Sequence, residues 1–222
     1  ANDDTPNASY YVNPGYGGQN FDAEYLFYKQ EGNSLSIGLQ TGFDISSLDG
    51  QLYSDGHRYF TGDLALSFDG NNSNYEYAVD FGNRSKGYFS GATISSQGVN
   101  VDSGVDTAGL YKVTSWNNDI YFTQSAPYAM SGGSLLLAAN GGNLQEGSGW
   151  VGGEYSFFNI FTFDLSNIAN LGQDFALDAH WTMSCGNDAL DGHVNLTQVP
   201  EPTPFLLFGL GLLGLLASRR KA

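Results

Sequence analysis

The sequence predicts an all-β fold: an antiparallel two-sheet sandwich, jelly-roll or immunoglobulin-like, followed by a short C-terminal hydrophobic helix. Two observations predict the sandwich. The chain contains 30 Gly, 14 Tyr and 15 Phe, and Gly disfavours a helix by about 1 kcal/mol per position relative to Ala, whereas aromatic residues suit pleated sheets. Apolar and polar residues also alternate over several short segments separated by turn residues, and no long segment has helical periodicity.

Two hairpins are the clearest predicted elements. The first joins strands 24–30 and 35–41, and the second joins strands 63–69 and 75–81. In the second strand of each hairpin, apolar residues alternate with polar or small ones, which is typical of a strand with one buried face and one solvent-exposed face. A turn rich in Gly, Asn and Ser separates the strands of each pair.

The later elements have weaker patterns. Further candidate strands are 110–113, 120–123, 135–139, 155–165 and 174–184, and the last of these is expected to close the domain. Residues 165–170 are compatible with a single helical turn, and the region 132–153 combines glycine-rich loops with one plausible strand. No linker divides residues 1–198, so we expect one β-sandwich domain at 1–198 and a separate tail at 199–222.

The domain is strongly acidic, which restricts its partners. The net charge of the chain is −15, and the basic residues before the tail are Lys29, Arg58, Arg84, Lys86 and Lys112. Nucleic acid is excluded as a partner, because its recognition needs clustered Lys and Arg. Neutral polysaccharides or divalent cations fit this charge better, and solubility alone explains it as the default interpretation.

The tail has three parts. A proline-rich segment, 199–204, precedes the apolar run 205–217, and a basic end follows it. The run of 13 residues is shorter than the ~20 residues that a bilayer core requires. The prolines keep the approach to it extended, and the positive-inside tendency places the basic end in the cytoplasm.

This order of residues resembles the PEP-CTERM sorting signal of Gram-negative bacteria. The residues that carry the resemblance are Val199, Pro200, Glu201, Pro202, Arg219 and Arg220. The resemblance implies recognition by an exosortase, a membrane-embedded cysteine protease, that removes the tail. It also implies export across the inner membrane to the cell surface or extracellular matrix, with the unprocessed tail held transiently in the inner membrane. A plain membrane anchor and a helix buried in an oligomer are the alternatives.

The domain carries a second resemblance. Segments 21–28 and 75–80 and the late element 180–188 are similar to bacterial exosortase-dependent surface proteins. That similarity implies a location rather than a reaction. The early strands are also loosely similar to family 9 carbohydrate-binding modules, but the aromatic binding residues of that family have no matching positions here.

One loop is a candidate calcium site. Asp69, Asn71 and Ser73 occupy positions 1, 3 and 5 of a calcium-loop pattern, and Asp80 occupies position 12. Position 6 is Asn74 rather than Gly, and Asp80 falls inside a predicted strand. A turn between two strands explains the same residues, so calcium stays an alternative and no other cofactor is expected.

Two further groups of residues could carry a function. His180, Cys185, Asp188 and His193 suggest a thiol nucleophile or a zinc site, yet their spacing fits no common zinc pattern, and we expect Cys185 to be a core residue. The aromatic residues Trp116, Trp150, Tyr11 and Tyr16 are candidates for stacking against sugars, with core packing as the alternative.

Taken together, these patterns predict a non-enzymatic exported surface or extracellular-matrix protein, associated with biofilm exopolysaccharide and sorted through its tail. The expected partners are an exosortase, exopolysaccharide and other copies of the chain. A carbohydrate-binding module and an unrecognised hydrolase remain the alternatives. No reaction can be assigned, because the sequence contains no His-Glu-Xaa-Xaa-His or Gly-Xaa-Ser-Xaa-Gly motif and no phosphate-binding loop.

Overall fold

The computed structural model describes residues 17–53, 58–82, 85–87, 99–100, 107–118 and 120–198. Strands β1 (Ala23–Glu31), β2 (Ser34–Thr41), β11 (Leu144–Val151) and β12 (Glu154–Asp164) form one sheet in the order β1-β2-β12-β11. Strands β5 (Leu64–Ser67), β6 (Tyr77–Asp80), β9 (Gly109–Asn117), β10 (Ala129–Ala138), β13 (Asp174–Thr182) and β14 (Ala189–Thr197) form a second sheet in the order β10-β9-β6-β5-β13-β14. The remaining described elements are the short pairs β3 (Gln51–Leu52) with β4 (Arg58–Tyr59) and β7 (Lys86–Gly87) with β8 (Val99–Asn100), and the 3-10 helices η1 (Gln19–Phe21), η2 (Thr123–Ser125) and η3 (Leu165–Asn167).

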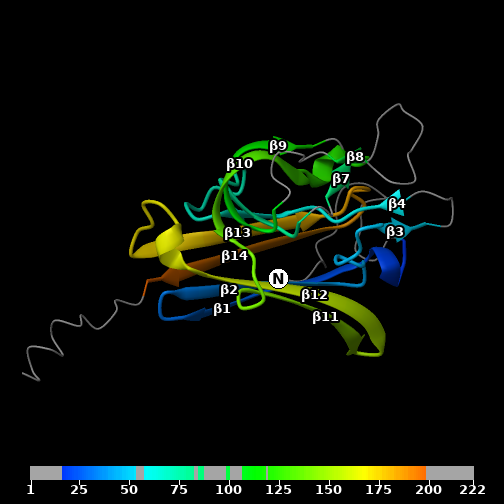
Figure 1. The fold of residues 1–222 in the computed structure, drawn as a ribbon, viewed down its shortest axis with the longest axis horizontal. Coiled ribbons are helices and arrows are strands. Elements are labelled where there is room, and N and C mark those ends of the chain that lie inside the picture. The colour runs from blue at the N-terminus through cyan, green and yellow to red at the C-terminus, as the bar shows by residue number, and fades with distance from the viewer. Residues whose placement is uncertain are drawn as a thin grey trace, which may run out of the picture.

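The two large sheets lie face to face, as the two layers in Figure 1 show. All strand pairs in both sheets are antiparallel. Strands β1 and β14 approach each other along one side of the sandwich. The predicted antiparallel sandwich is therefore confirmed at the level of its layers.

The core fills the space between the sheets. The four-stranded sheet contributes the alternate residues Leu35, Ile37 and Leu39 of β2, and the six-stranded sheet contributes Leu66 of β5 and Trp181 of β13. All of these side chains are fully or almost fully buried. Burial of each large apolar side chain stabilises the fold by about 1.5–3 kcal/mol, so the alternation seen in the sequence holds the two layers together.

Both predicted hairpins are confirmed. In the first, β1 and β2 are joined across Gly32 and Asn33, and Glu31 pairs with Ser34. In the second, Leu64 pairs with Val79. The predicted helical turn is also present as η3, where the Asp164 carboxylate accepts a hydrogen bond from the backbone N–H of Ser166.

Three predictions about strands were wrong. Segment 120–123 is not a strand, because Phe122 N–H donates to the carbonyl of Cys185 in a loop rather than joining a sheet. The segment 174–184 does not close the domain, because β14 follows β13 and pairs with it from Asp174 to Thr182. The glycine-rich region 132–153, where one plausible strand was expected among loops, contains both the end of β10 and the complete edge strand β11.

The tail falls outside the described residues, and so does the hydrophobic helix predicted within it. Tyr11 and Tyr16, two of the candidate sugar-stacking residues, also lie outside them. Within the described part of the chain, no helix has the length and the apolar character needed to cross a membrane.

Candidate binding pocket

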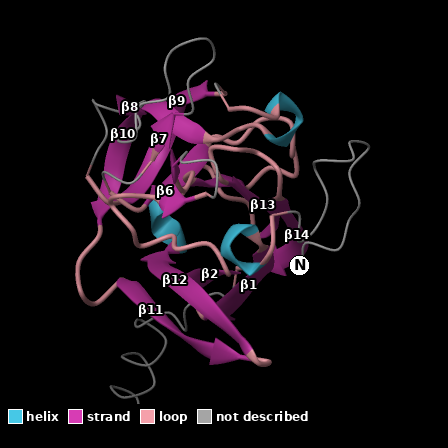
Figure 2. Cartoon of the chain, turned by 90° about the vertical axis from the view of Figure 1, so that its right-hand side faces the viewer, coloured by secondary structure: helices cyan, strands magenta, loops and turns pink. Residues whose placement is uncertain are grey.

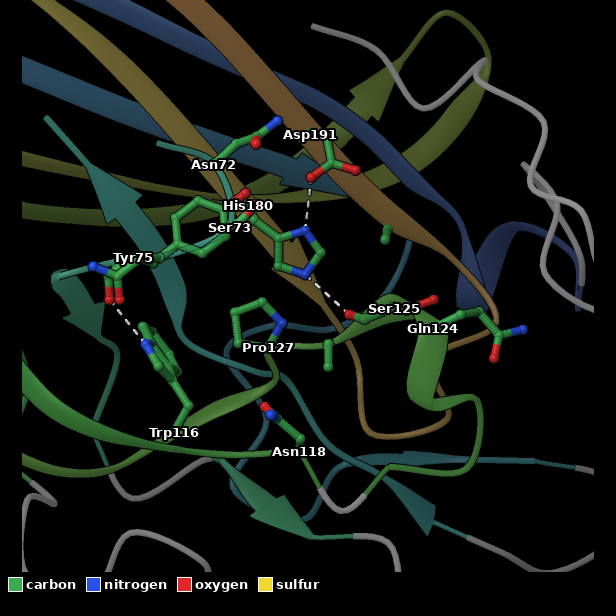
Figure 3. A pocket seen from close by; sticks show the side chains of 13 residues that line it. Asn72, Ser73, Tyr75, Trp116, Asn118, Gln124, Ser125, Pro127, His180 and Asp191 are labelled. Carbon is green, nitrogen blue, oxygen red and sulfur yellow. Dashed lines mark hydrogen bonds and ion pairs between the residues drawn. The ribbon is translucent and has the colours of Figure 1, made fainter. Parts of the chain in front are cut away.

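A pocket of about 530 Å³ opens beside the outer face of the six-stranded sheet. Four parts of the chain meet there: the turn between β5 and β6, the end of β9, the segment around η2, and the β13–β14 pair (Figure 3). The lining residues whose side chains matter below are Asn72, Ser73, Tyr75, Trp116, Asn118, Gln124, His180 and Asp191.

The β5–β6 turn is held in shape by its own side chains. The Asp69 carboxylate accepts hydrogen bonds from the backbone N–H of Asn71 and the hydroxyl of Ser67, both at 2.9 Å. The Asn71 side-chain oxygen accepts from the backbone N–H of Ser73 at 3.1 Å. These bonds are local side-chain mimics of a backbone turn, and they fix where Asn72 and Ser73 meet the pocket.

Two aromatic residues form one wall. The indole N–H of Trp116 donates to the backbone carbonyl of Tyr75 at 2.9 Å, so the two residues are positioned by each other. The Tyr75 ring lies beside the His180 ring, with ring centres 5.8 Å apart and planes inclined by 34°. Trp116 is half-buried, because part of its ring packs against Ala78, Tyr111 and Met130.

His180 is held from both sides. Its Nδ1 lies 2.8 Å from a carboxylate oxygen of Asp191, and its Nε2 lies 3.0 Å from the backbone carbonyl of Ser125. Both partners are hydrogen-bond acceptors, so the ring donates to both at once only in its doubly protonated form. The His180 side chain is buried, whereas that of Asp191 is 74% exposed and places its charge at the pocket rim.

Tyr75 remains a neutral phenol. Burial raises its pKa well above the ordinary value for tyrosine, and the negative charges of Asp191 and Asp178 raise it further. The hydroxyl is therefore available as a hydrogen-bond donor across the physiological pH range.

The pocket combines aromatic rings with uncharged polar side chains. Aromatic side chains provide apolar faces, and amide and hydroxyl side chains provide donors and acceptors. The described lining contains no Lys or Arg, and its carboxylate is Asp191. An anionic ligand would find no Lys or Arg partner among the described lining residues.

The family comparison concerns the other part of the chain. A family model for the PEP-CTERM protein-sorting motif matches residues 198–221. This chain carries a PEP-CTERM sorting motif. No curated protein and no solved structure is significantly similar to the chain.

The PEP-CTERM match includes the residues quoted above for the resemblance: Val199, Pro200, Glu201, Pro202, Arg219 and Arg220. It identifies an exported protein that an exosortase processes, with a membrane-anchoring sorting tail. The match begins at Gln198, where the described part of the domain ends. The motif is therefore a sorting tail that follows the described domain, and the pocket lies in that domain.

The residues considered for thiol or zinc chemistry do not form a site. Cys185 is buried, and burial raises the pKa of its thiol from 9.0 to about 12. Asp188 accepts from the backbone N–H of Ala23 at 3.0 Å, and His193 pairs with Asp178 at 2.7 Å. Across the described residues, no three His, Cys, Asp or Glu side chains gather closely enough to hold a metal. The expectation that Cys185 belongs to the core is confirmed.

The calcium-loop residues are divided between two places. Asp69, Asn71 and Ser73 lie together in the β5–β6 turn. Asp80 lies at the far end of β6, because Leu64 pairs with Val79 and so puts Asp80 opposite residue 63. That position is six residues before Asp69 in the chain, a distance of about 20 Å along an extended strand. The structure therefore does not bring Asp80 to the turn.

The two tryptophans considered for sugar binding lie on different sheets. Trp116 ends β9 and lines the pocket, whereas Trp150 lies on β11 and is 74% exposed. Trp150 stacks edge-on against Tyr155, with ring centres 5.6 Å apart. These residues therefore do not share one platform.

Sequence reasoning missed the role of Tyr75, His180 and Asp191 in the pocket. His180 and Asp191 are directly opposite each other in the β13–β14 pair. Recognising 189–197 as the partner strand of 174–182 would have placed them together. The polar residues of that segment interrupt its alternation of apolar and polar positions, so the segment was not recognised as a strand.

Proposed function

We propose that this PEP-CTERM chain is a non-enzymatic protein of the cell surface or biofilm matrix, which binds neutral exopolysaccharide in the pocket beside His180. The observation that carries the proposal is the pocket's composition. Trp116 and Tyr75 stand beside Asn, Gln and Ser side chains, with no Lys or Arg among the described lining residues. Sugars bind through such combinations, because their C–H faces suit aromatic rings and their hydroxyls need donors and acceptors.

Charge supports a neutral rather than an anionic glycan. The chain has a net charge of −15, and Asp191 adds a carboxylate at the pocket rim. A polymer of uronic acids would be repelled by both. A neutral polymer carries no charge to be repelled, and its hydroxyls can donate to the Asp191 carboxylate.

The state of the nucleophilic side chains supports a binding role. The hydroxyl of Ser125, whose carbonyl meets His180, donates instead to the carbonyl of Gly186 at 2.7 Å. Both nitrogens of His180 are occupied by acceptors, so the ring has no free nitrogen to serve as a base. The Cys185 thiol stays protonated at neutral pH because of its raised pKa.

The test is a saturable binding assay on polysaccharide from the producing cells. Trp116→Ala is expected to weaken binding about tenfold, which corresponds to about 1.4 kcal/mol and is the size of an aromatic contact. Since Trp116 also packs against Met130, Gln124→Ala provides a second variant at an exposed lining residue. Trp150→Ala is the matched control, because it removes an exposed tryptophan from the other sheet.

Two results would overturn the proposal. Binding that survives both Trp116→Ala and Gln124→Ala would remove the pocket from consideration as the glycan site. Turnover of any glycan or ester in a substrate library by the purified protein would contradict its non-enzymatic character and favour a hydrolase.

A further inference from the structure

The two sheets leave four edge strands, and three of them carry features that oppose pairing with another chain. Strand β10 departs from regular register with β9 at three places between Met130 and Leu137. Strand β14 carries the Asp191 carboxylate, which pairs with His180, and the polar His193, which pairs with Asp178. Strand β1 carries Lys29 and an irregularity after Ala23, and it runs beside β14. Bulges and charged residues are the usual protections of an exposed edge.

Strand β11 has only one of these protections, a single charged residue. It pairs with β12 in unbroken register from Leu144 to Val151. Its sequence Leu-Gln-Glu-Gly-Ser-Gly-Trp-Val contains no Pro or Lys, and Glu146 is its single charged residue. Its other edge has no strand partner among the residues that the structure describes.

Two of the exposed side chains of β11 are apolar, beside the exposed polar side chains Gln145, Glu146 and Ser148. Trp150 is 74% exposed and Val151 is 51% exposed. The β11–β12 hairpin extends away from the rest of the sandwich (Figure 2). A long, regular edge with exposed apolar residues is a template for strand addition, since each unpaired backbone group gains a hydrogen bond there.

We propose that β11 pairs antiparallel with β11 of a second copy of this chain. The two four-stranded sheets then become one continuous sheet across a two-fold axis perpendicular to it. Such an axis makes the contact isologous, so the same strand serves both partners.

The residues of β11 suit pairing with themselves. A two-fold axis perpendicular to the sheet leaves each side chain on its own face. Residues opposite each other must share a face, so one residue lies opposite its own copy and the axis passes midway between the two. With the axis at Gly147, Glu146 lies opposite Ser148 and Trp150 lies opposite Leu144. With the axis at Ser148, Glu146 lies opposite Trp150. Both registers avoid placing the two Glu146 carboxylates opposite each other, which would destabilise the pair.

Glycines make the contact surface flat. Gly147 lies beneath the Phe158 ring of β12, where a Cβ would come within 2.4 Å of the ring. A Cβ added at Gly149 would meet no atom within 4 Å, so that position is open. The dimer contact and the pocket lie on different sheets, so both can be occupied together.

Two matched variants of the full 222-residue chain, studied in a detergent that keeps the tail soluble, test the proposal. Gly149→Asp adds a carboxylate to β11, and Gly141→Asp adds one to the turn after β10. Neither glycine has an atom within 4 Å of its would-be Cβ, so both variants change the charge equally without a clash. Sedimentation velocity measures self-association, and amide hydrogen exchange of residues 144–151 reports pairing of the strand.

We expect the wild type and Gly141→Asp to dimerise equally, and Gly149→Asp to dimerise at least about tenfold more weakly. In the wild type, protection of amides 144–151 should rise with protein concentration. Equal association of the two variants would overturn the proposal and assign association to the tail or another surface. If Gly149→Asp disturbs the hairpin itself, wild-type exchange still decides, because protection that does not depend on concentration contradicts strand pairing.

Discussion

Asp63 allows the stability of the sandwich to be tested through a single buried carboxyl group. Its side chain is fully buried. One oxygen accepts from the backbone N–H of Met130 at 2.7 Å, and the other accepts from the hydroxyl of Ser85 at 2.9 Å. Its backbone N–H also donates to the carbonyl of Tyr128. Asp63, directly before β5, is thus hydrogen-bonded to the beginning of β10.

Burial raises the pKa of Asp63 from 3.8 to about 6, and the two hydrogen bonds offset only part of this effect. Between these values the unfolded chain has lost the proton while the folded chain retains it. The folded state therefore binds more protons, and this group makes stability fall as pH rises through that range. Each pH unit lowers the free energy of unfolding by about 1.4 kcal/mol, so roughly two units lower it by on the order of 3 kcal/mol. Above the folded-state pKa the contribution of Asp63 no longer changes with pH.

The variant Asp63→Asn cannot ionise, so it does not lose this stability. We expect the free energy of unfolding of the variant, minus that of the wild type, to rise by on the order of 3 kcal/mol between about pH 4 and pH 7. Urea denaturation at several pH values in this range measures the difference.

Asp164→Asn is the control with the opposite sign. Hydrogen bonds from Ser166 lower the pKa of the exposed Asp164 carboxyl, so its stabilising effect is present above the ordinary aspartate pKa and is lost in acid. A difference between Asp63→Asn and the wild type that does not change with pH would refute the reasoning about Asp63.

Two further predictions concern the core thiol and the tail. Cys185 should not react with a thiol-specific disulfide reagent at mildly alkaline pH while the protein is folded, because burial raises its pKa to about 12; rapid modification of the native protein, rather than of the urea-unfolded chain, would contradict this. Intact mass of the protein recovered from the native cell surface should show that the apolar segment 205–217 has been removed. A full-length tail on the surface protein, in cells that contain an exosortase, would count against processing.

Local patterns predicted the elements whose partners are close in sequence. In β2, Leu35 and Ile37 alternate with small polar residues, and the partner strand lies just across a two-residue turn. Strand β14 escaped prediction because Asp191, Gly192 and His193 interrupt the apolar residues in its middle. Its position is set by pairing with β13, which provides hydrogen-bond partners for its backbone along the full length.

The candidate site was only partly predictable for a similar reason. Trp116 was predicted as a candidate for stacking against sugars, with core packing as the alternative, and it lines the pocket; the turn containing Ser73 was recognised as a turn. That these two segments line the same pocket follows from the packing of β6 beside β9, where Tyr77 pairs with Lys112. That strand pairing cannot be predicted from the identities of the side chains alone.

The sequence by itself determined the destination of this protein and the layered nature of its domain. The sorting motif is a linear signal at residues 198–221, and alternation is a property of neighbouring residues, so both can be recognised without a fold. The tertiary structure decided the pocket and the regular edge of β11. Both depend on strand register and sheet order, which join residues as distant as Tyr75 and His180 and leave β11 at an edge.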